Sequence, residues 1–284
     1  MKRLLISVLT VGVVATAGVL ATNAFFSDTE TSTGNLFAAG ALDLQIDNES
    51  YVTDENGDLV LSPDTSWALD DPMGLFFNFS DVKPGDLGED TISLHVNDND
   101  AWICAAAQVT DDSDQTCTDP ELEDDLNCDE PGLGLGELDD EVNFAFWADD
   151  GDNVLETDEV DSIFISGPVS GLGGLGQIAL ADSDNNIWDG LEDSPVVGGD
   201  DYFIGKAWCF GTLTPNAIDP GVDLSPLVDG TGFDCNGEPV NNAAQTDQVI
   251  GDIQFYATQS RNNDDFLCDS DYSPVWPTPT PNGE

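Results

Sequence analysis

Positively charged residues are nearly missing from this sequence. Five Lys and Arg stand against 57 Asp and Glu, which gives a formal net charge of -52. Proteins bind nucleic acid largely through Lys and Arg contacts with phosphate, and a chain this negative repels both nucleic acid and anionic membrane surfaces. The composition therefore excludes nucleic acid as a partner. It favours a surrounding rich in salt or divalent cations, which screen or bridge carboxylates.

Catalytic patterns are also lacking. There is one histidine, His95, and neither an H-E-x-x-H zinc pattern nor a G-x-S-x-G nucleophile elbow. His95 alternates with apolar residues in "TISLHVN", so we interpret it as a strand residue. Residues 171–176, "GLGGLG", match the dinucleotide-binding fingerprint only in form, because no βαβ unit surrounds them. We therefore predict that the protein is not an enzyme and binds no nucleotide cofactor.

Amphipathic helical stretches are scarce, although 40% of the residues are apolar and a packed core is expected. Short alternating segments broken by Asp, Gly, Asn and Pro are typical of an all-β antiparallel sandwich. The clearest strand candidates are residues 36–46, 74–80, 90–96, 101–109, 142–148, 201–210 and 247–259; weaker ones are 161–166 and 176–181. Pro84 and Gly85 predict a type II turn that joins two strands. Residues 111–141 read as a long acidic surface insertion.

The N-terminus has the pattern of an export signal. Lys2 and Arg3 precede an apolar block at 4–20, and small residues follow up to Ala24. We expect a signal peptidase to cut between Ala24 and Phe25; an uncleaved membrane anchor is the alternative. The expected division is a signal peptide at 1–24, one sandwich domain at 25–268 and a Pro/Thr-rich tail at 269–284.

Six cysteines in an exported chain predict three disulfides, with reduced thiols as the alternative. Cys117 and Cys128 bracket an acidic, turn-rich stretch and are close enough in sequence to pair locally. The pairing of the other four stays open; these are Cys104, Cys209, Cys235 and Cys268.

Several segments together resemble a known family. "AFFSDTETSTGNLFAAGALDL", "NFSDVKPGD", "ISLHVNDNDAW" and "IQFYATQS" occur here in that order, and they are similar to segments of the camelysin and TasA family of exported proteins. The central, cysteine-bearing part looks like a larger, uncharacterised branch of it. The resemblance implies a SipW-type signal peptide, a jelly-roll sandwich and, for TasA-like members, fibres of a biofilm matrix. Some camelysin relatives are described as metallopeptidases, but this chain lacks the zinc ligands that such activity requires.

The resemblance also implies a role for the mature N-terminus as a donor strand. Phe25, Phe26, Leu36 and Phe37 would fill apolar positions in a neighbouring subunit while the backbone pairs along an open sheet edge. The alternative is that the same residues form an internal first strand.

Residues 148–159 follow the spacing of an EF-type calcium loop. Its positions three, five, seven, nine and twelve are taken by Asp150, Asp152, Val154, Glu156 and Glu159. Ala148 stands at position one, so Asp149 or a distant carboxylate must supply that ligand. Asn153 stands where the loop needs a left-handed residue. We predict a calcium site here, with a solvated acidic turn as the alternative.

A second, weaker calcium candidate lies at 182–193. Its spaced oxygens would come from Asp182, Asp184, Asn186 and Asp193, but Ile187 stands where the loop pattern has Gly.

The sequence as a whole predicts a non-enzymatic, exported structural protein of the cell surface or extracellular matrix. Its partners would be further copies of itself in a fibre, or other surface and matrix components, and it would be stabilised by calcium. The alternative is a monomeric, calcium-dependent surface adhesin or binding module. A secreted metallopeptidase is the least favoured reading.

Overall fold

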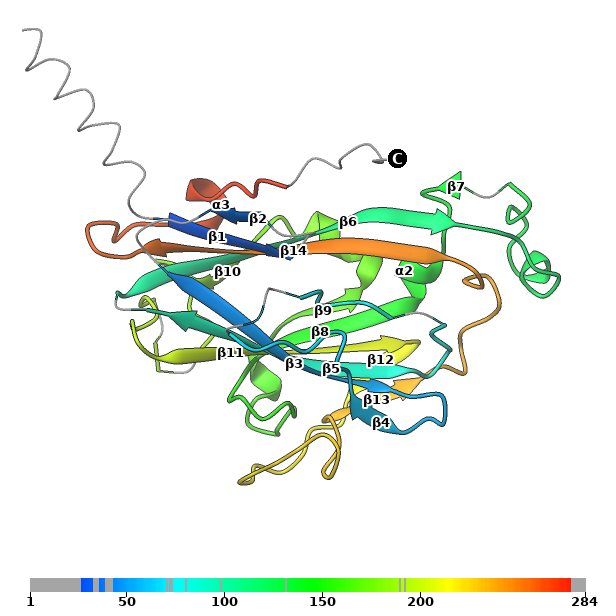
Figure 1. Ribbon diagram of the computed structural model, residues 1–284, viewed down its shortest axis with the longest axis horizontal. Coiled ribbons are helices and arrows are strands. Elements are labelled where there is room, and N and C mark those ends of the chain that lie inside the picture. Colours follow the sequence, from blue (N-terminus) through cyan, green and yellow to red (C-terminus); the bar gives the residue numbers. More distant parts are fainter. Residues whose placement is uncertain are drawn as a thin grey trace, which may run out of the picture.

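The protein is described by a computed structural model that covers residues 27–32, 36–38, 43–69, 71, 74–79, 81–97, 99–130, 132–188, 190–191 and 193–276. Within these residues the chain forms two antiparallel β-sheets stacked face to face, which confirms the predicted all-β sandwich (Figure 1). No helix among the described residues is both long enough and apolar enough to cross a membrane.

The first sheet has the strand order β10-β6-β14-β1-β2, with β7 paired to the end of β6. Its strands are β1 (Ser27–Ser32), β2 (Leu36–Ala38), β6 (Ala101–Asp114), β7 (Gly132–Leu133), β10 (Gln177–Ala181) and β14 (Gln248–Gln259). β1 pairs with β14 of its own chain over its full length, from Ser27 opposite Thr258 to Ser32 opposite Ile253.

The second sheet has the order β4-β3-β5-β11-β8-β9. Its strands are β3 (Leu44–Thr53), β4 (Leu59–Leu61), β5 (Leu87–Val96), β8 (Val142–Asp149), β9 (Ile163–Pro168) and β11 (Asp201–Phe210). A separate hairpin pairs β12 (Thr212–Pro215) with β13 (Phe233–Asn236). The helical segments are η1 (Glu121–Glu123), α2 (Leu138–Glu141), η2 (Val160–Ser162), η3 (Val169–Gly174) and α3 (Cys268–Asp271).

The main core lies between the two sheets. Ile92 and Leu94 of β5 are fully buried there and belong to one cluster with Ile103 of β6 and Phe255 of β14. Side chains alternate between the faces of a strand. Glu89 and Thr91 therefore point to the opposite, outer face of the second sheet, which is also buried because β13 and the chain after β8 cover it.

All six cysteines form disulfides, as predicted, and Cys117 pairs with Cys128. The two pairs that the sequence left open are Cys104 with Cys268, 164 residues apart, and Cys209 with Cys235. The first holds α3 on the outer face of β6, and the second holds β13 on β11. The long-range disulfides thus fasten covering segments to the sandwich rather than joining its two sheets.

Two of the predicted strands are wrong. Residues 36–46 do not form one strand, because Leu36–Ala38 belongs to the first sheet and Leu44 begins a strand of the second. The apolar alternation continues across the crossing, so it does not reveal the change of sheet. The segment Gly74–Phe79 is irregular. Phe76 inserts its ring between Trp67 and Phe255. The Phe76 carbonyl accepts a hydrogen bond from Lys206 Nζ at 2.9 Å.

Three other boundaries differ from expectation. The 81–86 turn forms, with Gly85 at φ 98° and Asp86 N donating to Lys83 O at 2.9 Å, but only its following segment is a strand. The expected insertion at 111–141 is partly sheet, since β6 runs to Asp114 and pairs with β7. The first part of the expected tail packs on the first sheet: Tyr272 is buried and stacks on Tyr256 of β14.

Candidate metal centre

The predicted calcium loop begins where β8 ends, at Asp149, and leads into η2. A strand rather than a helix therefore enters the loop, so only its spacing matches the EF type. The loop covers the outer face of the second sheet, where the indole of Trp147 lies over Gly205 of β11 so closely that a Cβ there would be 2.1 Å from the ring. The absence of a side chain at 205 leaves room for the Trp147 indole on this face of the sheet.

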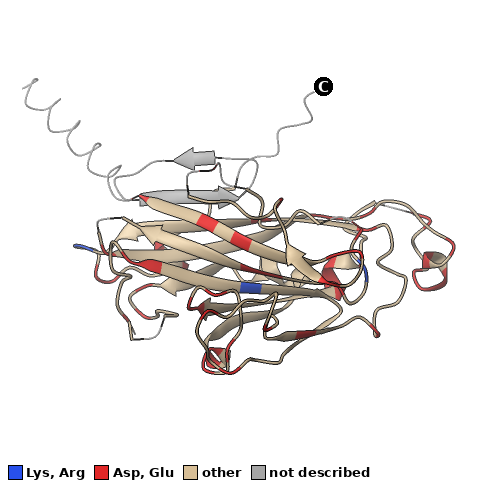
Figure 2. Ribbon diagram, turned by 60° about the horizontal axis from the view of Figure 1, so that its bottom comes forward, with Lys and Arg blue, Asp and Glu red and all other residues tan. Residues whose placement is uncertain are grey.

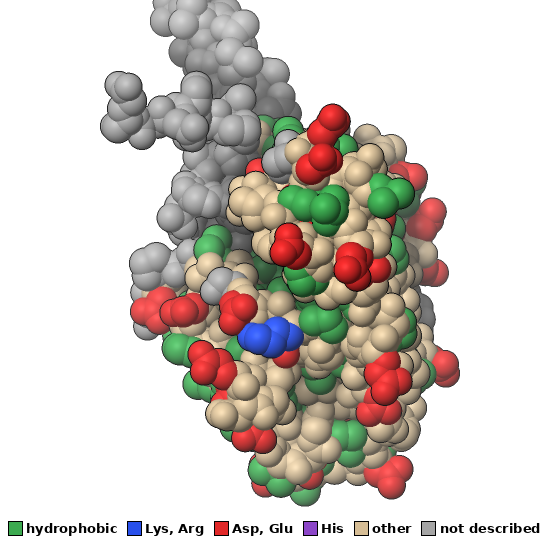
Figure 3. Space-filling view, turned by 90° about the vertical axis from the view of Figure 1, so that its right-hand side faces the viewer, with side chains coloured by type: hydrophobic (Ala, Val, Ile, Leu, Met, Phe, Trp, Pro, Cys, Tyr) green, Lys and Arg blue, Asp and Glu red, His purple; other side chains and the backbone are tan. Residues whose placement is uncertain are grey.

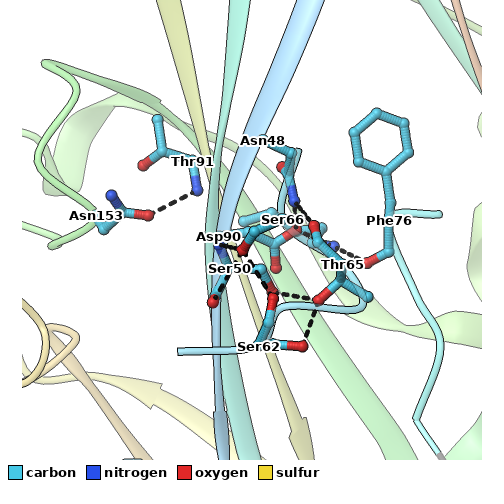
Figure 4. A network of polar contacts seen from close by, with 10 residues as sticks. Asn48, Ser50, Ser62, Thr65, Ser66, Phe76, Asp90, Thr91 and Asn153 are labelled. Carbon is cyan, nitrogen blue, oxygen red and sulfur yellow. Dashed lines mark hydrogen bonds and ion pairs between the residues drawn. The ribbon is translucent and has the colours of Figure 1, made fainter. Parts of the chain in front are cut away.

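The backbone of the loop has the predicted turn. Asn153 has a φ of 66°, the left-handed conformation expected from its position, and Gly151 has a φ of 106°. Asn153 Oδ1 also accepts a hydrogen bond from Thr91 N on β5 at 3.0 Å (Figure 4). Asn is one of the few residues other than Gly that tolerate this φ. The Asn153 side chain thus fixes the turn against the sheet as well as permitting it.

The carboxylates of the loop gather into two overlapping groups. Oxygens of Asp149, Asp150 and Asp152 lie within 4.8 Å of one another, and so do oxygens of Asp150, Glu156 and Glu159. Asp150 is shared between the groups. The structure therefore brings together all the predicted carboxylate ligands, and Asp149 joins them in the place of Ala148. These acidic clusters could hold a metal ion.

Hydrogen bonds hold the two ends of the loop in place. Asp149 Oδ1 accepts from Trp147 Nε1 at 3.1 Å, and its Oδ2 accepts from Thr91 Oγ1 and Gly151 N at 3.0 Å each. Glu159 Oε1 accepts from Asp150 N at 2.9 Å, and its Oε2 accepts from Glu156 N at 3.1 Å. A carboxylate oxygen has further lone pairs, so these bonds orient the groups and leave acceptor capacity for a cation.

Burial, together with the crowding of negative charge, raises the pKa values of these acids. Burial, followed by the neighbouring carboxylates Asp150 and Asp149, raises the pKa of Asp152 to about 7. Burial and the charge of Asp149 raise the pKa of Glu159 to about 8. Burial raises the pKa of Asp149 to about 6, against the opposing effect of its hydrogen bonds. None of the ion pairs found among the described residues reaches this loop.

Glu89 is a nearby acid that sequence reasoning missed. It is fully buried on the outer face of β5, and neither of its carboxylate oxygens has a hydrogen-bond partner among the described residues. Burial raises its pKa well above the ordinary value, and the charges of Asp149 and Asp90 raise it further. Its position in an alternating strand carried no signal, because a single acid among so many Asp and Glu does not stand out.

The weaker candidate at 182–193 uses its polar groups differently. Asp182 Oδ1 accepts from the backbone N–H groups of Asp184 and Asn185, and its Oδ2 accepts from Cys268 N at 3.0 Å. Asn186 donates to Ser194 O at 2.7 Å. Over the described part of the chain, the acids of this segment are not among the groups of three or more potential ligands that lie close together.

His95 lies on β5, as predicted. Its Nδ1 is 2.6 Å from Asp201 Oδ1 and its Nε2 is 3.1 Å from Asp47 Oδ2, so both ring nitrogens face carboxylates of the adjacent strands. Of the expected donor-strand residues, Leu36 and Phe37 lie in β2. Phe25, Phe26 and the cleavage position at Ala24 lie outside the described residues.

Comparison of the chain with protein-family models, with curated proteins and with solved structures finds no match.

Proposed function

We propose that the protein is a non-enzymatic, exported structural protein of a cell surface or extracellular matrix, and that calcium bound in the 149–159 loop completes its fold. The observation that carries the proposal is the clustering of Asp149, Asp150, Asp152, Glu156 and Glu159 in one hydrogen-bonded loop. Calcium accepts six to eight oxygen ligands in flexible geometry, which suits an irregular set of carboxylates better than the strict octahedron of magnesium.

Two features of the whole chain support an extracellular role. Three disulfides are typical of an oxidising environment. Asp and Glu are spread over loops and strands while Lys and Arg are rare, so the surface suits solvent in which calcium or salt is abundant (Figure 2).

Assembly into fibres would use β1 and β2. In the described part of the chain, β1 pairs only with β14 and β2. The β1–β2 pair therefore lies at one edge of the first sheet and is joined to the other strands only by the β1–β14 ladder. Moving the β1–β2 segment to the β14 of a neighbouring subunit would break one ladder and re-form the same ladder between chains. The resemblance to the camelysin and TasA family leads to the same proposal.

The test is a cysteine pair across this ladder. Ser27→Cys with Thr258→Cys places two thiols at Cα partners in β1 and β14. In the mature protein with calcium, strand exchange predicts fibres by electron microscopy and a ladder of covalent oligomers on a non-reducing gel. The single variants are the controls, because one added thiol per chain gives disulfide-linked dimers at most.

A monomeric, calcium-dependent surface binding module is the alternative, and the pairing of β1 within its own chain favours it. The double variant would then give only monomers with an internal cross-link at every salt and calcium concentration. That result would refute the fibre subunit and leave the calcium loop to be tested by itself.

A further inference from the structure

A second buried cluster of acids lies at the far end of the first sheet, away from the predicted calcium loop. Asp114 is the last residue of β6, Glu121 begins η1 and Asp247 immediately precedes β14. One carboxylate oxygen from each lies within 4.8 Å of the other two. Residues 133 positions apart in the chain thus bring like charges together, with no ion pair to them among the described residues.

Two of the three acids are buried, Asp247 is half-buried, and all three are incompletely bonded. Asp114 is 3% exposed and Glu121 is fully buried. Asp114 Oδ1, Glu121 Oε1 and Asp247 Oδ1 have no hydrogen-bond partner among the described residues. Buried acceptors without a donor destabilise a fold, and charged ones do so most. Three at one point therefore indicate a ligand with positive charge.

The remaining oxygens fix the geometry of the cluster. Glu121 Oε2 accepts from Thr118 N at 3.0 Å, and Asp247 Oδ2 accepts from Glu137 N at 2.6 Å and from Leu138 N at 3.2 Å. The other oxygens of these two carboxylates, Glu121 Oε1 and Asp247 Oδ1, have no partner among the described residues. Oxygens that bind one calcium ion at about 2.3–2.6 Å lie at most about 5 Å apart, so the observed spacing suits a shared ion.

Two more acids, Glu137 and Asp125, lie near the cluster. Burial and the charges of Asp125 and Asp247 raise the pKa of Glu137 to about 7. Glu137 Oε2 is buried without a partner among the described residues. The carboxylate of Glu137 is therefore close enough to the cluster to interact with its charge.

We propose that Asp114, Glu121 and Asp247 form a second divalent-cation site, with calcium as the fitting ion, that fastens the disulfide-closed loop 117–128 to the junction of β6 and β14. Glu121 belongs to that loop, whereas Asp114 ends β6 and Asp247 immediately precedes β14. The ion replaces the missing basic residues as the link between loop and sheet. This end of the sandwich carries many acidic and few basic side chains on its surface (Figure 3).

The site is tested with calcium itself and a matched pair of variants. Glu121→Gln removes a ligand charge, and Glu123→Gln changes an exposed acid of the same η1 segment. Calorimetric titration should show one fewer calcium ion bound per molecule in Glu121→Gln, whereas Glu123→Gln binds as much as wild type. Hydrogen exchange at 115–131 should slow on calcium addition in wild type and in Glu123→Gln only.

The proposal is overturned if Glu121→Gln keeps the wild-type calcium stoichiometry or the calcium-dependent protection of 115–131. Asp114→Asn serves as a second variant with the same expected loss, should Glu121→Gln fail to fold. Asp152→Asn separates this site from the 149–159 loop: it should leave the calcium response of 115–131 intact even where that loop binds nothing.

Discussion

Lys206 is one of the few basic residues in the chain, and it is fully buried. Its Nζ lies 2.5 Å from Asp90 Oδ2, directly across β11 and β5, and 3.7 Å from the centre of the Phe77 ring. Burial lowers the pKa of Lys206 and raises that of Asp90, while their mutual attraction opposes both shifts. A buried pair of this kind contributes little net stability, but removing one partner leaves an uncompensated charge in the core.

Lys206→Met should therefore destabilise the protein by about 3–5 kcal/mol, because Asp90 stays buried without its partner. The double variant Asp90→Leu with Lys206→Met should recover most of the loss, since neither charge then remains. Urea unfolding measures both. Lys83→Met is the control, because Lys83 pairs with Asp81 on the surface and should leave stability unchanged. Equal losses in the single and double variants would contradict this account of the pair.

At the scale of an element, the 149–159 loop makes stability depend on pH. The pKa values of Asp149, Asp152 and Glu159 are raised to about 6, 7 and 8 in the folded protein, above their ordinary values of 3.8 for Asp and 4.5 for Glu. The folded chain therefore binds more protons than the unfolded chain between about pH 4 and about pH 8. Without calcium, stability falls as the pH rises through this window, since the crowded acids must ionise.

Calcium should reverse this dependence, because ligands that have lost their protons bind the ion more tightly. We expect the melting temperature to fall from about pH 5 to about pH 8 in chelator, and the gain from added calcium to grow over the same range. Glu159→Gln should reduce both effects, whereas Asp161→Asn, an exposed acid just beyond the loop, should change neither. A calcium effect of equal size at both pH values would count against the loop as the site.

At the scale of the whole molecule, a net charge of -52 opposes compaction. Sodium chloride only screens this repulsion, and its effect is weak for buried acids. A bound divalent cation instead neutralises specific carboxylates and stabilises the folded state by mass action.

Melting temperature should therefore rise with sodium chloride in the presence of chelator, and rise much further with millimolar calcium at the same ionic strength. Thermal unfolding monitored by circular dichroism compares the two series. Superimposable series at matched ionic strength would show that screening alone stabilises the protein, and would remove the case for specific cation sites.

Several local features of this protein were predictable from its sequence. β8, β11 and β14 lie within one or two residues of the segments expected from alternation, and the Cys117–Cys128 pair follows from short spacing. The crowded acids of the 149–159 loop and the left-handed Asn153 also follow from spacing. Alternation, turn chemistry and ligand spacing act over a few residues, so the sequence alone determines them.

Tertiary structure decided which distant residues meet. It divided the expected 36–46 strand between two sheets. It placed Phe76, in an irregular segment, in the core, where its carbonyl accepts a hydrogen bond from Lys206. It also buried Glu89 close to the acids of the 149–159 loop. It also brought together Asp114 and Asp247, which are 133 positions apart in the chain. Such contacts depend on strand order and register, and in a chain where Asp and Glu are so frequent no local pattern distinguishes the few that become buried together.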